Sequence, residues 1–455
     1  MKTNTLYVFR ISLVAALGGL LFGFDTAVIS GTTEWLQSIY KLSDTQLGFT
    51  VASALIGTII GSLSVSWPTD KYGRRKVLIF MGVLYFISAI GSAIAWNWGS
   101  FLTFRLIGGL GVGGASVVSP MYIAEISPAK QRGRLVALAQ FNIVFGILLA
   151  FISNYIITLL DLGSTEWRWM FGVEAIPAAA FILFMFSNPR SPRWLISKGR
   201  TEEALTVLTR LEGDRSIAEE EGIAIKKSLE ESNGKISIKL LLKKYLKPLL
   251  LACTIAAFNQ LSGINAVLYY APKIFKSTGA GVESAMLQSV LIGLVNLIFT
   301  MLALAAIDRL GRKKLMIVGS IGYIVSLATV SVVFFLNGEA FTGLSGTVLL
   351  GALIVFVASH SFGQGAVIWV FISEIFPNNV RAMGQSFSSF ILWIFAALVS
   401  QTFPMIIGSF GGGTIFAVYC GFMVMQLIWV LVLMPETKGI PLEEIHKKLK
   451  IGQEN

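Results

Sequence analysis

The sequence has little charge, two cysteines and two histidines, and each shortage excludes a class of protein. Charged residues make up 13% of the 455 positions, about half of the roughly 25% that is usual in soluble chains. A soluble enzyme of this composition would expose large apolar patches. Cys253 and Cys420 both lie in apolar runs, so neither a disulfide framework nor a cysteine metal site is expected. His360 and His446 form no histidine cluster in the sequence, and we expect neither a metal nor a cofactor.

Hydrophobic residues are what the chain has in excess: they make up 55% of it, and the mean hydropathy is +0.74. A membrane-spanning segment needs about 20 predominantly apolar residues, and such segments are helices because hydrocarbon offers the backbone no hydrogen-bond partners. The first run is as long as a full span, so we expect a retained helix and no cleaved signal peptide. The twelve predicted spans lie at about 9–31, 46–67, 77–96, 101–123, 135–158, 168–187, 248–273, 284–306, 315–336, 347–371, 382–406 and 414–434.

The formal net charge of +11 follows the predicted topology. Lys and Arg concentrate in the loops at 70–76, 130–134 and 308–314, whereas the connections around 96–100 and 408–413 carry almost no charge. Basic loops favour the cytoplasmic side, so we expect these loops and both termini in the cytoplasm of a multi-pass cell-membrane protein. We expect the lipid bilayer, and no nucleic acid, as a partner.

A polar stretch interrupts the predicted spans in the middle of the chain. Its acidic and basic residues alternate, and its apolar positions recur at intervals of three and four, which predicts short amphipathic cytoplasmic helices. The expected domains are an N-terminal six-helix bundle at 1–187, this linker at 188–246, a C-terminal six-helix bundle at 247–434 and a cytoplasmic tail at 435–455.

Two motifs recur in the same order in the two halves. The sequence DKYGRRK at 70–76 follows the second span, and DRLGRKK at 308–314 follows the eighth. A Glu with an Arg seven residues beyond it follows the fourth and the tenth spans. Internal repeats of this kind are typical of secondary transporters. The two pairs are Glu125 with Arg132 and Glu374 with Arg381.

Taken together, these motifs make the sequence resemble the sugar porter family of the major facilitator superfamily over essentially the whole chain. Further signatures are FGFDTAV from Phe22, FRLIGGLGVG around Arg105, NQLSGINAVLYYAP at 259–272 and PETKG at 435–439. The resemblance implies an all-α membrane protein with twelve transmembrane helices in two pseudo-symmetric six-helix bundles, the major facilitator fold, joined by a short helical cytoplasmic linker.

Asp25 and Arg105 are candidates for proton coupling. A charge at the centre of a spanning helix costs about 2.5–3.5 kcal/mol on insertion scales, so it is rare without a partner or a function. We expect Asp25 to be charged while it pairs with Arg105 and protonated when the two separate. The resemblance supports this switch, because bacterial xylose–proton symporters have Asp at the matching place and animal glucose uniporters have a neutral residue. The alternative is an ion pair that only fixes helix packing.

Sugar contacts are expected from amides and aromatic rings. An amide offers both a donor and an acceptor to a sugar hydroxyl, and Gly263 can relax the helix between Gln260 and Asn265. The alternatives are interhelical hydrogen bonds by the amides and an interfacial position for Trp369. Tyr269 and Tyr270 resemble the family's extracellular gate, or they simply pack at a helix end. The candidate sugar contacts are Gln140, Asn259, Gln260, Asn265, Asn296, His360 and Trp369.

The repeated charges predict an intracellular gate. Anchoring by positive charge explains the Lys and Arg residues equally well, but it does not explain the repeated carboxylates. Arg190 introduces a positive charge where the family typically has Glu, in the motif after the sixth span. The gate candidates are Asp70, Arg74, Arg75, Glu125, Arg132, Arg134, Asp308, Arg312, Glu374 and Arg381.

These features predict a proton-coupled monosaccharide symporter that works by alternating access as a monomer. Analogy puts a hexose such as glucose ahead of a pentose such as xylose. The alternatives are an uncoupled sugar facilitator (uniporter) and a pentose– or polyol–proton symporter. An enzyme is not expected, because the sequence offers no nucleophile–base pair or metal cluster at bilayer depth.

Overall fold

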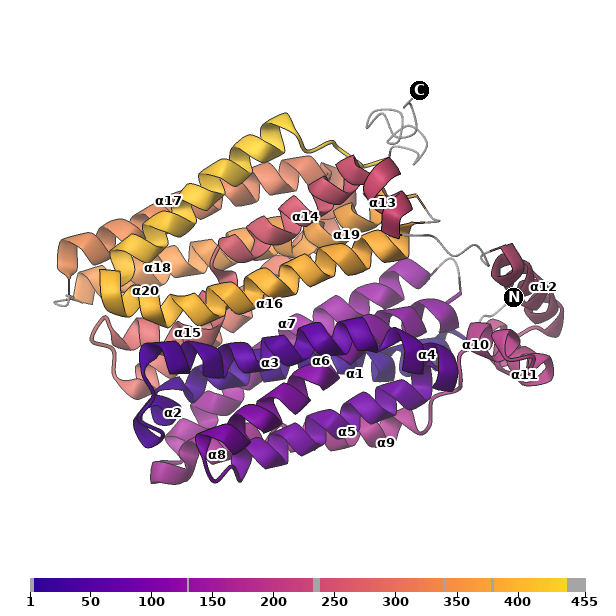
Figure 1. Ribbon diagram of the computed structural model, residues 1–455, viewed down its shortest axis with the longest axis horizontal. Coiled ribbons are helices and arrows are strands. Elements are labelled where there is room, and N and C mark those ends of the chain that lie inside the picture. Colours follow the sequence, from indigo (N-terminus) through magenta and orange to yellow (C-terminus); the bar gives the residue numbers. More distant parts are fainter. Residues whose placement is uncertain are drawn as a thin grey trace. The chain divides into compact units, whose positions relative to one another are not determined.

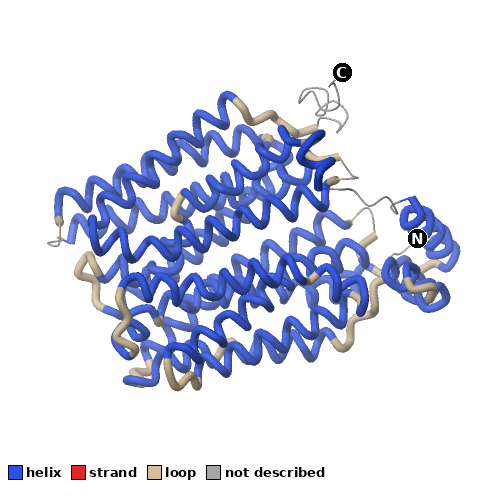
Figure 2. The backbone as a smooth tube through the Cα atoms, viewed as in Figure 1, coloured by secondary structure: helices blue, strands red, loops and turns tan. Residues whose placement is uncertain are grey.

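The computed structural model describes residues 4–128, 131–231, 238–338, 341, 343–377 and 380–439. Within these ranges every regular element is a helix, and no strand is present (Figure 2). The predicted all-α fold is therefore confirmed. His446 and the rest of the tail beyond residue 439 lie outside the described residues.

Each of the first six predicted spans coincides with helix. Short helices connect some of them: η1 (Ile29–Gly31), α2 (Thr33–Ile39), α4 (Ser66–Tyr72) and η2 (Gly163–Thr165). The spans themselves are α1 (Thr5–Val28), α3 (Asp44–Ser64), α5 (Arg74–Ala93), α6 (Trp98–Ile126), α7 (Arg132–Leu159), and α8 with α9 (Glu166–Gly172 and Ala175–Met185).

The remaining six spans are also helical, although one element contains two of them. The elements are α14 with α15 (Leu246–Leu261 and Ile264–Lys276), α16 (Val282–Leu310), α17 (Arg312–Asn337), α18 (Gly343–His360), the π-helix η3 (Ser361–Gly365), α19 (Ala366–Ile375) and α20 (Arg381–Val432). The 52 residues of α20 far exceed the roughly 20 that one span needs. Gly411, with φ 79°, breaks the helical conformation inside α20. Eleven described helices are long and apolar enough to cross a membrane, and this break in α20 makes the number of spans twelve.

The polar middle stretch forms the short helices that its periodicity predicts. They are α10 (Pro192–Ser197), α11 (Thr201–Glu212), α12 (Arg215–Glu231) and α13 (Ile238–Lys244). On α11 the buried apolar side chains are Ala204, Val207, Leu208 and Leu211. Their spacing places them on one face of the helix, so α11 is amphipathic.

The chain divides into two compact units, and this division does not follow the predicted halves of the sequence. The first unit contains Met1–Thr26, Ser53–Ala150 and Trp167–Lys235. The second unit contains Ala27–Ala52, Phe151–Glu166 and Ile236–Asn455. In the first unit α5 packs along α6 and α9, and in the second α17 packs along α18 and α20 (Figure 1). The predicted domain boundaries remain a prediction.

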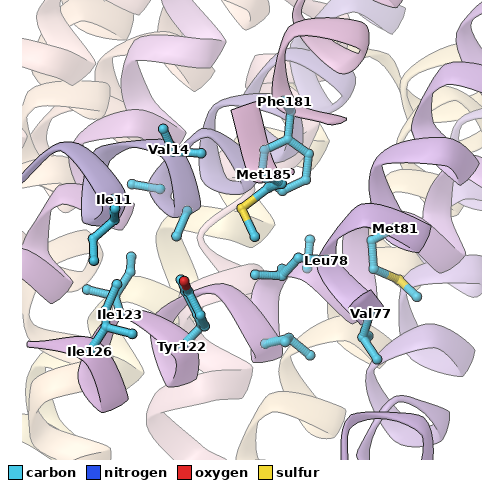
Figure 3. Close-up of a cluster of buried hydrophobic side chains, with 14 of the residues drawn as sticks. Ile11, Val14, Val77, Leu78, Met81, Tyr122, Ile123, Ile126, Phe181 and Met185 are labelled. Atoms are coloured by element: carbon cyan, nitrogen blue, oxygen red, sulfur yellow. The ribbon is translucent and has the colours of Figure 1, made fainter. Parts of the chain in front are cut away.

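The core of the first unit is built by α1, α5, α6 and α9. Figure 3 shows Ile11 and Val14 of α1 gathered with Val77 of α5, Tyr122 of α6 and Phe181 of α9. Lipid chains are as apolar as these side chains, so close van der Waals packing, more than removal from water, holds such helices together.

Small residues let α3 and α6 approach closely. A Cβ atom added to Gly109 would lie 2.0 Å from the carbonyl oxygen of Ala54, and one added to Gly113 would lie 2.1 Å from that of Thr58. Contacts of this kind require glycine, because any side chain would push the two backbones apart. This crossing fixes the position of α6 against α3, and α6 carries Arg105.

Candidate functional site

Asp25 and Arg105 form a buried ion pair in the first unit. Nη1 of Arg105 donates to Oδ1 of Asp25, and Nη2 lies 3.4 Å from both Oδ2 and the Asp25 carbonyl oxygen. The two residues are 3% and 2% exposed, and the guanidinium lies over the ring of Phe171 at 5.3 Å. The structure thus brings together the two residues that the sequence singled out at bilayer depth.

A second buried carboxyl group lies in the same region, and the sequence interpretation missed it. Glu174 is 1% exposed and interacts electrostatically with both Asp25 and Arg105. Among the described residues neither of its oxygens has a hydrogen-bond partner, and the same holds for the Tyr85 hydroxyl and the Ser88 hydroxyl. A carboxyl group inside the predicted span 168–187 is the signal that could have found it. We call Asp25, Tyr85, Ser88, Arg105 and Glu174 the buried polar cluster.

The amides of the seventh span form a continuous chain in the second unit. Nε2 of Gln260 donates to Oδ1 of Asn259 at 2.8 Å, and Nδ2 of Asn265 donates to Oε1 of Gln260 at 2.8 Å. Gly263 separates α14 from α15 with φ 84°, and a Cβ atom there would lie 2.4 Å from the Tyr419 ring. The predicted break at this glycine is confirmed, and it allows the bond between Gln260 and Asn265.

The other sugar candidates have different surroundings. Oδ1 of Asn296 accepts a hydrogen bond from Ser361 of η3 at 2.8 Å. The His360 ring bonds through Nδ1 to the Tyr323 hydroxyl of α17 at 2.5 Å. Trp369 is 40% exposed on α19. Gln140, half-buried on α7, lies in the first unit.

Part of the predicted intracellular gate forms an ion-pair network at the basic end of the first unit. Nη2 of Arg74 lies 2.9 Å from Oε1 of Glu125, and Nη1 lies 3.6 Å from Oδ1 of Asp70. The Ser191 hydroxyl donates to Oε2 of Glu125 at 2.5 Å. Arg75 instead donates to two backbone carbonyl groups at the end of α9.

The second unit repeats this network. Nη2 of Arg312 lies 2.7 Å from Oε1 of Glu374, and Nη1 lies 3.1 Å from Oδ1 of Asp308. The Thr437 hydroxyl donates to Oε2 of Glu374 at 2.6 Å, as Ser191 does in the first unit. Arg381 stays close to its own turn, since its Nε lies 3.4 Å from the Phe376 carbonyl oxygen. The side chains of Arg132 and Arg134 lie outside the described residues.

Glu436 extends only the second network. Its carboxylate accepts hydrogen bonds from the backbone N–H groups of Arg312, Lys313, Thr437 and Lys438, at 2.9–3.1 Å. Burial raises the pKa of Glu436, but the four N–H donors together lower it more, so this pKa lies below the ordinary glutamate value.

Arg190 occupies the corresponding place in the first unit and behaves differently. It lies 3.7 Å from Glu203 of α11 and over the Trp194 ring at 5.9 Å. The Trp194 ring, in turn, covers Gly73, which has φ 87°. Among the described residues of the first unit, no carboxylate takes the place of the cap that Glu436 supplies to the start of α17.

The end opposite the basic loops carries a further polar network in the second unit. Lys276 pairs with Glu34, and Nζ of Lys273 donates to Oε1 of Gln37 at 3.0 Å. Nearby, the Tyr270 ring stacks on Phe403 at 5.1 Å, and its hydroxyl donates to the Ser400 carbonyl oxygen at 3.2 Å. The sequence interpretation missed the two lysines, because charge at the end of a span is ordinary until its partner is known. Tyr269, 3% exposed, lies beside Tyr270 on α15.

Comparison with known proteins covers nearly the whole chain. The family model described as "Sugar (and other) transporter" matches residues 11–449. The D-xylose-proton symporter of Escherichia coli (strain K12) is 38% identical over 97% of this chain and 96% of its own length. The Arabinose-proton symporter of Bacillus subtilis (strain 168) is 37% identical over 97% and 95%, and the Glucose transport protein of Synechocystis sp. is 36% identical over 97% of each.

Solved structures agree with these relatives. A partially occluded inward open conformation of the xylose transporter XylE from E. coli matches with a TM-score of 0.85 and 37% identity over 96% of this chain and 100% of that one. The proton:xylose symporter XylE bound to 6-bromo-6-deoxy-D-glucose matches with a TM-score of 0.81 and 38% identity over 98% and 100%. The predicted family resemblance is confirmed, and the chain belongs to the sugar porter family of the major facilitator superfamily, whose members are multi-pass membrane transporters.

Proposed function

We propose that this protein is a proton-coupled monosaccharide symporter of the cell membrane that works by alternating access, as a monomer with both termini in the cytoplasm. The observation that carries the proposal is the buried pair of Asp25 and Arg105 with a second carboxyl group, Glu174, in its field. The relatives named as proton symporters support the same reading.

The charges of the buried polar cluster supply a reason to bind a proton. Asp25 and Glu174 are two carboxyl groups, and Arg105 is the only guanidinium in the cluster. An uncompensated carboxylate is costly to bury, so a proton on one carboxyl group restores the balance. Protonation of Asp25 weakens its attraction for Arg105. The proposal is that this loss of attraction lets the helices rearrange when the sugar binds.

The amide chain supplies the sugar contacts. Each bond that Gln260 makes to Asn259 and Asn265 joins a donor and an acceptor, and a sugar hydroxyl can replace either partner. The exposed ring of Trp369 offers a flat apolar face to a pyranose. Gln140 and His360 remain predicted contacts. The charge networks centred on Glu125 and Glu374 serve as the intracellular gate, and Tyr269 with Tyr270 as the extracellular gate.

A pentose is the better first substrate. The preference for glucose has only analogy behind it. The relatives are named for D-xylose and arabinose as well as for glucose. Competition in proteoliposomes tests this order: unlabelled xylose should displace labelled xylose at lower concentration than glucose does. A stronger effect of glucose would return the hexose to first place.

Uphill uptake tests the coupling. Purified protein in sealed vesicles with an imposed pH gradient should accumulate the sugar, and Asp25→Asn should abolish accumulation while sugar counterflow continues. Glu166→Gln is the matched control, since Glu166 is also buried but bonds to Thr158 outside the cluster. Uphill uptake that survives in Asp25→Asn would refute coupling through Asp25, and equilibration without accumulation in the unmodified protein would identify a facilitator.

A further inference from the structure

A groove lies on the first unit between α3 and α4 on one side and α5 on the other. Its cavity volume is about 430 Å³, within the range of about 300–1,000 Å³ that is usual for ligand pockets. Leu110 of α6 forms the floor, because α6 approaches α3 closely at Gly61. The groove shares no residue with the buried polar cluster or the amide chain, so neither the proton nor the sugar accounts for it.

The walls of this groove are apolar along most of their length. Val65 lies on one side, and Val77, Phe80 and Leu84 lie on the other. Phe80 is 56% exposed and lies within the apolar candidate span Arg74–Ala93. The hydroxyl of Ser64 is already bonded to the Gly61 carbonyl oxygen, at 3.3 Å. Such a surface suits a hydrocarbon chain.

The groove ends in positive charge at the level of the basic loop. Lys76 and Tyr72 line this end. Lys71 lies next to it, with Nζ 4.6 Å from the Trp67 ring centroid and 5.2 Å from that of Tyr72. Trp and Tyr rings are typical of the headgroup level of a membrane. The neighbouring Asp70 forms an ion pair with Arg74. Its carboxylate therefore does not neutralise Lys71 or Lys76, and both lysines can bind an anionic ligand.

We propose that this groove binds an anionic phospholipid of the leaflet that faces the basic loops. One acyl chain lies along the apolar walls, and the phosphate group binds at Lys71 and Lys76. A lysine near an anionic membrane surface favours negative lipid, and the combination of apolar walls with a positive end selects a molecule that has both parts. A zwitterionic lipid fits the walls equally well but gains less from the lysines.

The second half supplies a built-in comparison. Arg309 and Lys314 repeat the positions of Lys71 and Lys76 in the motif, so the positive charge recurs. The aromatic residues do not recur, since the matching positions are Ala305 and Leu310. Charge alone therefore predicts two equivalent lipid sites, whereas the proposed groove predicts one.

Native mass spectrometry of the full chain tests the proposal. The protein is equilibrated with equal amounts of phosphatidylglycerol and phosphatidylcholine, and retained lipid is counted. The double variant Lys71→Ala/Lys76→Ala should lose preference for phosphatidylglycerol by about fivefold for each lysine removed. The matched control Arg309→Ala/Lys314→Ala should keep it. Equal losses in the two variants would overturn the groove in favour of general attraction to basic loops.

The apolar part needs its own test. Ser64→Phe keeps both lysines and fills the groove, so it should also lose phosphatidylglycerol, and the smaller Ser64→Leu serves if the first variant does not fold. Sugar counterflow in phosphatidylcholine vesicles verifies folding of each variant. Glycerol 1-phosphate, which has no acyl chain, should not displace the lipid. Retention of phosphatidylglycerol by both Ser64 variants, or displacement by glycerol 1-phosphate, would show that the groove walls are not the site.

Discussion

Single residues decide the charge of the buried polar cluster. Arg105 compensates one carboxyl group at most, while Asp25 and Glu174 both lie in its field. The remaining groups of the cluster, Tyr85 and Ser88, are neutral hydroxyls. A change at any one charged position therefore alters the charge balance of the whole cluster. The effects of two such substitutions on stability should not be additive.

Arg105→Met tests this dependence. Removing one partner of a buried ion pair leaves an uncompensated charge and costs about 3–5 kcal/mol. We expect a correspondingly large fall in thermal stability, measured in detergent by size-exclusion chromatography after heating. Adding Asp25→Asn removes the orphaned charge and should recover at least half of the loss. Purely additive losses in the double variant would contradict a direct energetic coupling between the two residues.

Glu436 makes a pH-dependent contribution to stability at the basic end. Because its pKa is lower in the folded protein than its ordinary value, this contribution is present above about pH 4.3, the usual glutamate value, and is lost as the pH falls through the folded pKa. The thermal stability of the unmodified protein should therefore fall more steeply below about pH 4.3 than that of Glu436→Gln. Parallel curves for the two proteins would show that the four N–H bonds do not depend on the charge.

The predictability of individual residues depended on how unusual each one is in its setting. Asp25 and Arg105 could be found because charge is rare at bilayer depth. Glu174 satisfies the same criterion, but it lies beside an aromatic-rich segment with no repeat to draw attention to it. The sugar contact of His360 stays a prediction. Its hydrogen bond to Tyr323 of α17 could not be predicted, because contacts between helices cannot be read from one sequence.

At the scale of helices, breaks are as informative as spans. Gly263 was predicted to relax the seventh span, and it does so with a left-handed backbone. The π-helix η3 was not predicted, since no local residue pattern distinguishes it from α-helix. Its Ser361 reaches Asn296 of α16, so this unpredicted turn supports a predicted sugar contact.

The crossing of α3 and α6 should tolerate no side chain at Gly109. Gly109→Ala would place a Cβ atom 2.0 Å from the Ala54 carbonyl oxygen, and such overpacking costs about 1–3 kcal/mol or more. Gly351→Ala is the control, because nothing lies within 4 Å of a Cβ atom there, and replacing an exposed helical glycine gains up to about 1 kcal/mol. Relative to the unmodified protein, Gly109→Ala should lower the thermal stability and Gly351→Ala should leave it unchanged or raise it. A harmless Gly109→Ala would mean that the two helices are not held at this distance.

At the scale of the molecule, the repeated halves are similar in motif and unequal in detail. Arg74 with Glu125 and Arg312 with Glu374 repeat one arrangement, which the duplicated motifs predicted. Glu436 caps the start of α17, whereas Arg190 points its charge to Glu203 of the linker. The sequence shows Arg190 where the family typically has Glu. Its ion pair with Glu203 could not be predicted, because the motif does not reveal how α11 packs. The two networks of the proposed gate are therefore related in motif but have different partners.

The proposed coupling to a proton would make sugar accumulation depend on membrane voltage. One charge that crosses with each sugar contributes about 2.3 kcal/mol per 100 mV, which corresponds to roughly fiftyfold accumulation at an interior-negative 100 mV. Vesicles that hold this potential by a potassium gradient should approach that ratio, and the ratio should fall to one when the gradient is removed at equal pH. Asp25→Asn should give a ratio of one at every potential. If the accumulated ratio of the unmodified protein ignores voltage while responding to pH, sugar movement carries no net charge, and a single proton taken up with each neutral sugar is the wrong stoichiometry.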